Sequence, residues 1–242
     1  VKAKGTTLGA DNGLGLAMAM AVLESSDIKH GPIEFLCTID EETGMTGAMA
    51  LKPGLLHGDI LINLDSETEG ELYIGCAGGL DASAHDTYVP AEYDKTWECW
   101  SLAVKGFKGG HSGMDIVLYR GNANKVAARV IYALMNHAGV KLLDFEGGTL
   151  RNAIPREAFA IVGVPTESKE DFEERYLEFG QALMEEFKHT EPDMRFAVED
   201  VEKAPKMVMS NDDLCYLLLT LVGLPNGVLA MSFAMPGLVE TS

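Results

Sequence analysis

The sequence predicts an α/β segment with a parallel-rich sheet over residues 1–80, followed by an α+β domain over residues 81–242. In the first segment, short apolar runs typical of buried strands alternate with helical stretches, which favours a parallel sheet covered by helices. In the second segment, the expected elements follow the order β-α-β-β-α-β of the ferredoxin-like fold, an antiparallel sheet with two helices on one face. A length of 242 residues suits one or two such domains.

The first segment is expected to contain two helices and two strands. A buried helix is predicted over Gly13–Ser25, where Ala, Met and Leu dominate after an Asp-Asn-Gly turn. The apolar runs Ile33–Ile39 and Asp59–Leu64 have the length and composition of buried strands. The helical stretch Thr46–Leu51 lies between them, so these elements together form the α/β segment.

The second segment supplies the remaining elements. Its strands are expected at Trp97–Phe107, Lys141–Gly147, Ala158–Val164 and Met194–Val201, and its helices at Asn122–His137, Ser168–His189 and Asn211–Val222. Ser210 is expected to cap the last helix, because Asp212 and Asp213 follow it in the first turn.

Composition narrows the classes of function. Thirty-seven acidic and nineteen basic side chains give a net charge of −18, so the chain repels phosphate backbones and anionic lipids. We therefore expect no nucleic-acid partner and no membrane partner. The four cysteines form no CxxC pair, which indicates neither a disulfide framework nor a cysteine-based zinc site, and a cytoplasmic location is expected.

Acidic residues follow both expected strands of the first segment. Glu41 and Glu42 follow the first strand, Asp65 follows the second, and Asp11 lies in the Gly-rich turn that enters the first helix. Ligand sites in open α/β sheets lie beyond the carboxyl ends of the strands. Crowded carboxylates repel one another unless they are protonated or bridged by cations, so a site for divalent metal ions is predicted here.

Two metal ions would account for the number of carboxylates. A two-metal hydrolase needs a bridging carboxylate, further ligands on each ion, and an acid/base group beside the bridging water. Neighbours in an extended segment point to opposite sides, so Glu41 and Glu42 are expected to have different tasks. The alternative interpretation is that these residues are solvated charges in loops at the strand ends.

Longer motifs point to a family. The first segment carries TTLGADNGLGLAMAMAVLE, TIDEETGMTGA and LINLDSETEGELYIGCAGG, and the second carries KGFKGGHSGMDI, RGNANK and GGTLRNAIPREAFA. In this order along most of the chain, they resemble the aminoacyl-histidine dipeptidases of the dinuclear zinc aminoacylase/carboxypeptidase clan. The second set resembles the lid domain of that family. The resemblance implies a metallodipeptidase that hydrolyses Xaa-His dipeptides.

The resemblance also implies a role for each matching carboxylate. Asp11 would bridge two zinc ions, Glu42 would ligate one ion and Asp65 the other, and cobalt or manganese could replace zinc. Glu41 would be the general base that activates the bridging water. A cis peptide bond is implied between Asp11 and Asn12, which is rare for a residue other than proline.

The lid would supply the contacts to the substrate. His111 would polarise the scissile carbonyl, acting from the lid of a partner subunit, and Asn152 would hold the substrate backbone or carboxylate. Arg120 and Arg156 are further candidates for carboxylate recognition. The implied partners are a dipeptide substrate and a second copy of the chain in a homodimer. Without the resemblance, His111 and Asn152 would be interpreted as turn residues.

Two features of the family have no counterpart in this sequence. The family site includes two histidine ligands, one in an HxD motif before the bridging Asp and one near the C-terminus, and the family chain is about twice as long. None of the six histidines stands in such a context. The chain is therefore expected to be an internal fragment with three of five metal ligands. Since zinc usually takes at least four ligands, the fragment alone is expected to bind zinc weakly and to be inactive.

Two other functions stay open at this point. Another peptidase or aminoacylase of the same clan would use the same metal core on a different acyl or peptidyl substrate. As a fragment, the chain could instead act as a non-catalytic dimerisation module of the lid type. A substrate panel separates the first alternative, and a chain that dimerises without binding metal would favour the second.

Overall fold

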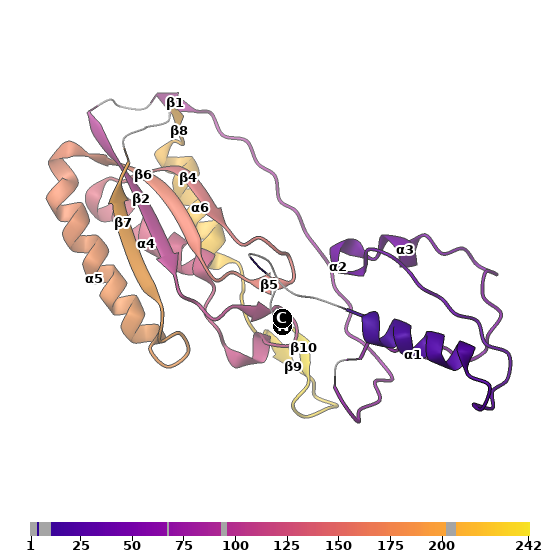
Figure 1. Ribbon diagram of the computed structural model, residues 1–242. Helices are drawn as coiled ribbons and strands as arrows, with labels where there is room; N and C mark the ends of the chain where they lie inside the picture. Colours follow the sequence, from indigo (N-terminus) through magenta and orange to yellow (C-terminus); the bar gives the residue numbers. More distant parts are fainter. Residues whose placement is uncertain (1–3, 5–10, 67, 93–95, 202–206) are drawn as a thin grey trace. The chain divides into compact units, whose positions relative to one another are not determined.

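The computed structural model describes residues 4, 11–66, 68–92, 96–201 and 207–242 (Figure 1). It divides into two compact units, Val1–Ser83 (unit 1) and Ala84–Ser242 (unit 2). Unit 2 contains the hydrophobic core of the described residues, and unit 1 contains short helices joined by irregular chain.

A four-stranded antiparallel sheet forms the centre of unit 2. Its strands lie in the order β4-β6-β2-β7, with bounds β2 Trp97–Lys105, β4 Lys141–Gly147, β6 Ala158–Pro165 and β7 Arg195–Asp200. Helix α4 (Ala123–Ala138) connects β2 to β4, and helix α5 (Lys169–Phe187) connects β6 to β7. The order of these elements is the β-α-β-β-α-β order that the sequence predicts.

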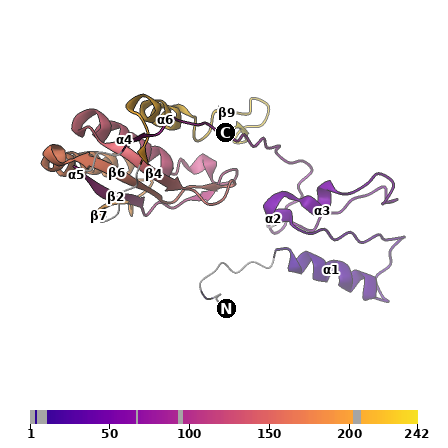
Figure 2. The same ribbon diagram turned by 90° about the horizontal axis from the view of Figure 1, so that it is seen from above.

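The core of unit 2 lies between this sheet and its helices. Alternate residues of β2 face the helices: Leu102 and Val104 are 3% and 2% exposed and lie opposite Ala160 and Ala158 of β6. Figure 2 shows α4, α5 and α6 (Asn211–Gly223) on the same side of the sheet. The side chains that fill this layer are mostly branched or aromatic, which is why the period-2 and period-3.6 patterns in the sequence are clear.

The predicted cap of α6 is confirmed. The Ser210 hydroxyl oxygen accepts a hydrogen bond from the backbone N–H of Asp213 at 3.1 Å. A second contact holds the other end of this helix, where the Lys125 ammonium group donates to the carbonyl oxygen of Val222 at 2.8 Å. The end of helix α6 is thereby fixed to α4.

Several short elements in unit 2 were not predicted. Three two-stranded antiparallel pairs occur: β1 (Ala91–Glu92) with β8 (Met207–Val208), β3 (Gly110–His111) with β5 (Ala153–Ile154), and β9 (Ala230–Met231) with β10 (Val239–Thr241). Short 3-10 helices occur at Ile116–Leu118 and Thr166–Ser168. Elements of two or three residues are too short to show a hydrophobic period, which is why no sequence pattern indicated them.

The prediction of a parallel-rich sheet in the first segment is wrong for the residues that the structure describes. Unit 1 has helices α1 (Gly13–Glu24), α2 (Glu41–Gly44) and α3 (Thr46–Met49), whereas Ile33–Ile39 and Asp59–Leu64 form no strand. A β-strand is defined by its backbone hydrogen bonds to a neighbouring strand. No such hydrogen bonds join these two runs to each other or to another described segment.

The expectation that the first helix is buried is also wrong. In α1, Gly15 is the one buried residue, while Leu14 is 69% exposed and Met20 is 56% exposed. The helix has apolar residues all around, a pattern of helices surrounded by protein on every side. The described residues of unit 1 do not surround α1 in this way.

Candidate functional site

Asp11 and Asp65 lie next to a hydrogen bond that joins two distant segments of unit 1. The Asn12 side-chain amide donates to the carbonyl oxygen of Leu64 at 2.6 Å. The side-chain oxygen of Asn12 also caps α1 by accepting from the Gly15 N–H at 2.8 Å. The peptide bond between Asp11 and Asn12 is cis, as predicted. The side chain of the residue after one predicted metal ligand thus binds the backbone of the residue before another.

Glu41 and Glu42 occupy the first turn of α2 rather than the extended segment that was expected. The chain enters this helix through Asp40, which adopts a left-handed backbone conformation with φ of 65°. The Asp40 carboxylate accepts hydrogen bonds from the hydroxyl groups of Thr43 and Thr46, and these bonds lower the pKa of Asp40 below its ordinary value. Successive helical residues are about 100° apart, so the two glutamates still point in different directions.

These carboxylates do not form a metal centre by themselves. Asp11, Glu41, Glu42 and Asp65 are all exposed. Among the described residues, no three His, Cys, Asp or Glu side chains are close enough together to hold a metal ion. Carboxylate oxygens suit divalent cations, but zinc sites normally include nitrogen or sulfur ligands as well. The described residues therefore do not fit a complete zinc site.

In unit 2, the β3–β5 pair brings His111, on β3, close to Asn152, which directly precedes β5. His111 lies opposite Ala153 in the ladder, and the Ser112 N–H donates to the Asn152 carbonyl oxygen at 2.8 Å. Both His111 and Asn152 are exposed. Two residues that are 41 positions apart in the sequence are thus joined through main-chain hydrogen bonds.

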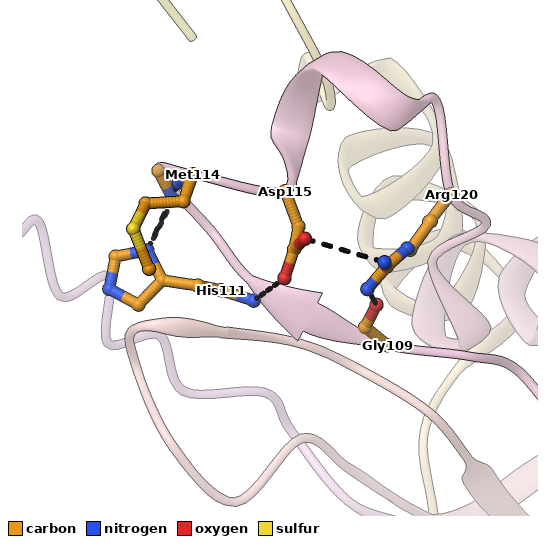
Figure 3. A network of polar contacts seen from close by, with 6 residues as sticks. Gly109, His111, Met114, Asp115 and Arg120 are labelled. Carbon is orange, nitrogen blue, oxygen red and sulfur yellow. Dashed lines mark hydrogen bonds and ion pairs between the residues drawn. The ribbon is translucent and has the colours of Figure 1, made fainter. Parts of the chain in front are cut away.

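The imidazole of His111 has a defined hydrogen-bonding state. Its Nδ1 atom accepts from the backbone N–H of Gly113 at 3.0 Å and of Met114 at 3.2 Å (Figure 3). An atom that accepts from backbone donors carries a lone pair, so the proton of the neutral ring is on Nε2. His111 is therefore prepared to donate a hydrogen bond from Nε2 to an oxygen atom of a ligand.

Asp115 and Arg120 hold the segment around His111. Asp115 Oδ2 accepts from the His111 N–H at 2.8 Å, and Asp115 Oδ1 lies 3.3 Å from Arg120 Nη2. Arg120 Nη1 donates to the Gly109 carbonyl oxygen at 2.5 Å (Figure 3). The guanidinium group of Arg120 is thus engaged inside the segment. Asp115 was not among the predicted residues, although its place four residues after His111 in GGHSGMD was a usable signal.

Arg156, between β5 and β6, lies against the same segment. Its Nε atom donates to the Phe107 carbonyl oxygen at 3.3 Å, and the Phe107 N–H donates back to the Arg156 carbonyl oxygen at 3.3 Å. Gly109 has a φ of +63°, and a Cβ atom there would collide with the aliphatic part of Arg156. The glycine is required for this close approach. Arg156 itself is exposed, so its guanidinium group is accessible to a ligand.

The comparisons with known proteins fit this organisation. Residues 102–191 match the model of the M20 peptidase dimerisation domain. Across its whole length the chain is 43% identical to the cytosol non-specific dipeptidase of Escherichia coli (strain K12), of which it covers 50%. The chain is thus similar along its whole length to part of a dipeptidase. It spans about half the length of the curated relative that it matches throughout.

A solved structure extends the match. The chain is 45% identical to the aminoacylhistidine dipeptidase of Vibrio alginolyticus, with a TM-score of 0.71 over 99% of this chain and 49% of that chain. A shorter match, 45% identical over 28% of this chain, is to the uncharacterized protein YqjE of Bacillus subtilis (strain 168). The resemblance to aminoacyl-histidine dipeptidases is therefore confirmed. In the part of the chain that the structure describes, no helix is long and apolar enough to cross a membrane.

Proposed function

We propose that the whole protein is a cytoplasmic metallodipeptidase that hydrolyses dipeptides of the Xaa-His type. Residues 1–80 would belong to its catalytic domain and residues 81–242 would form its lid. The hydrogen bond from the Asn12 side chain to the Leu64 carbonyl oxygen supports this proposal most directly, because it links the residue after Asp11 to the residue before Asp65. The similarity to a cytosolic dipeptidase supports both the activity and the location.

Asp11, Glu42 and Asp65 would be metal ligands in the whole protein, together with ligands outside the described residues. Two zinc ions, or cobalt or manganese, would make a water molecule more acidic and stabilise negative charge. Glu41 would take a proton from the attacking water and return it to the leaving amine. Its place beside Glu42 in the first turn of α2 suits a base that stands next to a ligand.

The lid residues would act on the substrate. His111 would donate its Nε2–H to the carbonyl oxygen as negative charge develops there, because its Nδ1 is already occupied by two backbone donors. Asn152 and Arg156 would hold the substrate carboxylate, and both are exposed on the strand pair or next to it. Arg120, which the sequence placed among the substrate-binding residues, would contribute by holding the His111 segment.

Glu41→Gln in the whole protein tests the catalytic role. Removing a general base lowers turnover by about 10²–10⁴-fold. We therefore expect kcat to fall by about a thousandfold, while zinc content measured by atomic absorption stays unchanged. Retained turnover with zinc bound would remove Glu41 from this role. A panel of Xaa-His and other dipeptides, a tripeptide and an N-acyl amino acid distinguishes a dipeptidase from the other enzymes of the clan.

A mixing experiment tests whether His111 acts from a partner subunit. In a homodimer with exchange between subunits, Glu41→Gln and His111→Ala chains form mixed dimers in which one site has both intact residues. Equal mixing should restore about a quarter of the wild-type activity if the histidine is supplied in trans. Activity that stays at the level of the separate variants would place His111 and Glu41 in the same subunit's site or outside it.

For the 242-residue chain alone, a non-catalytic dimerisation module is the second candidate. The match of residues 102–191 to a peptidase dimerisation domain favours it, as does the lack of a complete metal centre among the described residues. Sedimentation and zinc titration calorimetry decide between the two states. Stoichiometric, tight binding of two zinc ions by this chain would exclude the second candidate.

A further inference from the structure

Glu191 is a buried carboxylate behind the segment that carries His111. It is 1% exposed. Its Oε2 atom accepts from the Lys108 N–H at 2.8 Å, and its Oε1 atom accepts from the Gly121 N–H at 2.7 Å. Lys108 and Gly121 are the two ends of residues 108–121, which we call the His111 loop. One side chain thus holds both ends of the loop.

Glu191 is itself fixed by the end of α5. Its N–H donates to the Phe187 carbonyl oxygen at 2.7 Å, and its carbonyl oxygen accepts from the Met194 N–H at 3.1 Å. The ring of Phe187 meets the ring of Phe107 edge to face with centroids 6.4 Å apart. Because Phe107 directly precedes the loop and is 1% exposed, the carboxylate and the aromatic pair hold the same end of it.

The ends of the His111 loop pack tightly against Glu191. A Cβ atom on Gly121 would lie 2.5 Å from a carbon of the Phe107 ring and 3.2 Å from Glu191 Cγ. Gly106 has a φ of +84°, and a Cβ atom there would collide with the Asp193 carbonyl oxygen. Glycine is therefore needed on both sides of the contact. Small displacements of the Glu191 side chain cannot be absorbed by empty space around it.

The contacts continue from the loop ends to the imidazole. Arg120, next to Gly121, donates to the Gly109 carbonyl oxygen and pairs with Asp115. Asp115 in turn accepts from the N–H of His111 (Figure 3). An unbroken series of hydrogen bonds and peptide links thus runs from the buried carboxylate to the residue that would touch the substrate.

We propose that Glu191 is a positioning residue that holds the His111 loop in the form in which His111 presents Nε2–H to the substrate. The inference rests on the proposed role of His111 in hydrolysis. A carboxylate has acceptors for both N–H groups, and such charge-assisted bonds are stronger than neutral ones. A glutamine at this position has one acceptor oxygen, so its NH₂ group would face one of the two backbone donors.

Hydrogen exchange in the 242-residue chain tests the structural part of the proposal. In Glu191→Gln, at least one of the amides of Lys108 and Gly121 loses its acceptor. That amide should exchange about tenfold faster than in the wild type. The ¹⁵N spectrum of the His111 ring should change from one tautomer to a mixture. Glu185→Gln is the matched control, since Glu185 is an exposed residue of α5 with the same change of charge. Unchanged exchange and an unchanged ring spectrum in Glu191→Gln overturn the proposal.

Glu191→Asp covers the case in which the glutamine variant fails to fold. It keeps the charge but is one methylene shorter, so its carboxylate reaches one of the two N–H groups at most. We expect faster exchange at one end of the loop and the same change in the ring spectrum. Wild-type exchange at both ends in this variant contradicts the proposal as directly as the glutamine result would.

Kinetics of the whole protein separate this inference from the proposed function. Glu191→Gln should lower kcat by about tenfold with KM within about twofold, since a misplaced donor is felt mainly in the transition state. His111→Ala serves as the reference. If His111→Ala retains full turnover, the proposed role of His111 fails, whatever Glu191 does. If His111→Ala loses turnover and Glu191→Gln keeps wild-type kcat, the positioning role fails alone.

Discussion

Unit 1 and unit 2 contain apolar runs that look alike in the sequence, yet unit 2 buries them and unit 1 does not. Val162 in β6 and Leu134 in α4 are fully buried, whereas Leu61 and Ile62 are 83% and 75% exposed. The difference lies in the partners rather than in the residues. Every strand of the unit 2 sheet has its neighbours within the described chain, and the unit 1 runs have none there. An apolar run therefore indicates a segment that needs other residues to bury it. The topology determines whether those residues are present.

The largest expected contrast between the units is in hydrogen exchange of the 242-residue chain. Amides of α4 should be protected at least about a thousandfold relative to an unfolded chain, because they open only with the core. Amides of residues 59–64 should exchange within about tenfold of the unfolded rate, since no ladder protects them. Mass spectrometry of peptic fragments measures both. Equal protection in the two units would mean that unit 1 finds partners that the described residues do not reveal.

Two leucine substitutions compare how much a buried side chain of unit 2 and an exposed side chain of unit 1 contribute to the free energy of unfolding. Leu134→Ala should lower the free energy of unfolding by about 3 kcal/mol, because it opens a cavity in a filled core. Leu61→Ala should change it by less than about 0.5 kcal/mol, because the side chain is exposed. Urea denaturation followed by tryptophan fluorescence is suited to this, as both tryptophans, Trp97 and Trp100, lie in β2. A similar loss in both variants would contradict the contrast.

The smallest effect concerns an ion pair between the two long helices of unit 2. Arg129 of α4 holds Glu186 of α5 through two hydrogen bonds of 2.8 and 2.6 Å, which lower the pKa of Glu186 below its ordinary value of 4.5. A carboxyl group with a lowered pKa in the folded state stabilises it above the ordinary pKa, and this contribution is lost as the pH falls through the folded value. Both side chains are more than a third exposed, so solvent reduces the contribution to about 0.5 kcal/mol.

Glu186→Gln tests that contribution. The variant should be less stable than the wild type by about 0.5 kcal/mol at pH 7, and the difference should be smaller at pH 3, because the contribution of the pair decreases as the wild-type carboxyl group gains a proton. Chemical denaturation at the two pH values measures the difference. Unit 1 has no part in this pair, so a pH-dependent difference in the exchange of residues 59–64 would show that the effect is not local.

The sequence was sufficient for unit 2 because its elements carry their own periods and pair with one another. The helices around Leu134 and Tyr176 and the strands around Leu102 and Val162 were predicted close to their observed bounds. In unit 1 the same reasoning assumed a sheet, and a parallel sheet depends on partners that no local pattern can identify. The exposed runs at Ile33–Ile39 and Asp59–Leu64 are the result.

The candidate site follows the same division. His111 and Asn152 were identified from motifs, and the structure places His111 on β3 and Asn152 directly before its partner strand β5. The cis bond after Asp11 was identified in the same way. Glu191 was missed because it lies 70 positions from Gly121 and 83 from Lys108, and nothing near it in the sequence records these contacts. A backbone N–H group is present in almost every residue type, so the residues that Glu191 contacts carry no sequence pattern that indicates the contact.

The two-residue ladder between β3 and β5 has a consequence for the substrate preference of the proposed dipeptidase. The span from His111 to Asn152 is set by main-chain hydrogen bonds, which do not depend on the identity of the neighbouring side chains. In the proposed dipeptidase, substitutions at nearby exposed positions, such as Met114 or Leu150, would therefore change which dipeptides are accommodated while the two proposed contact points keep their separation. Because backbone hydrogen bonds set this separation, the surrounding side chains can vary without changing it.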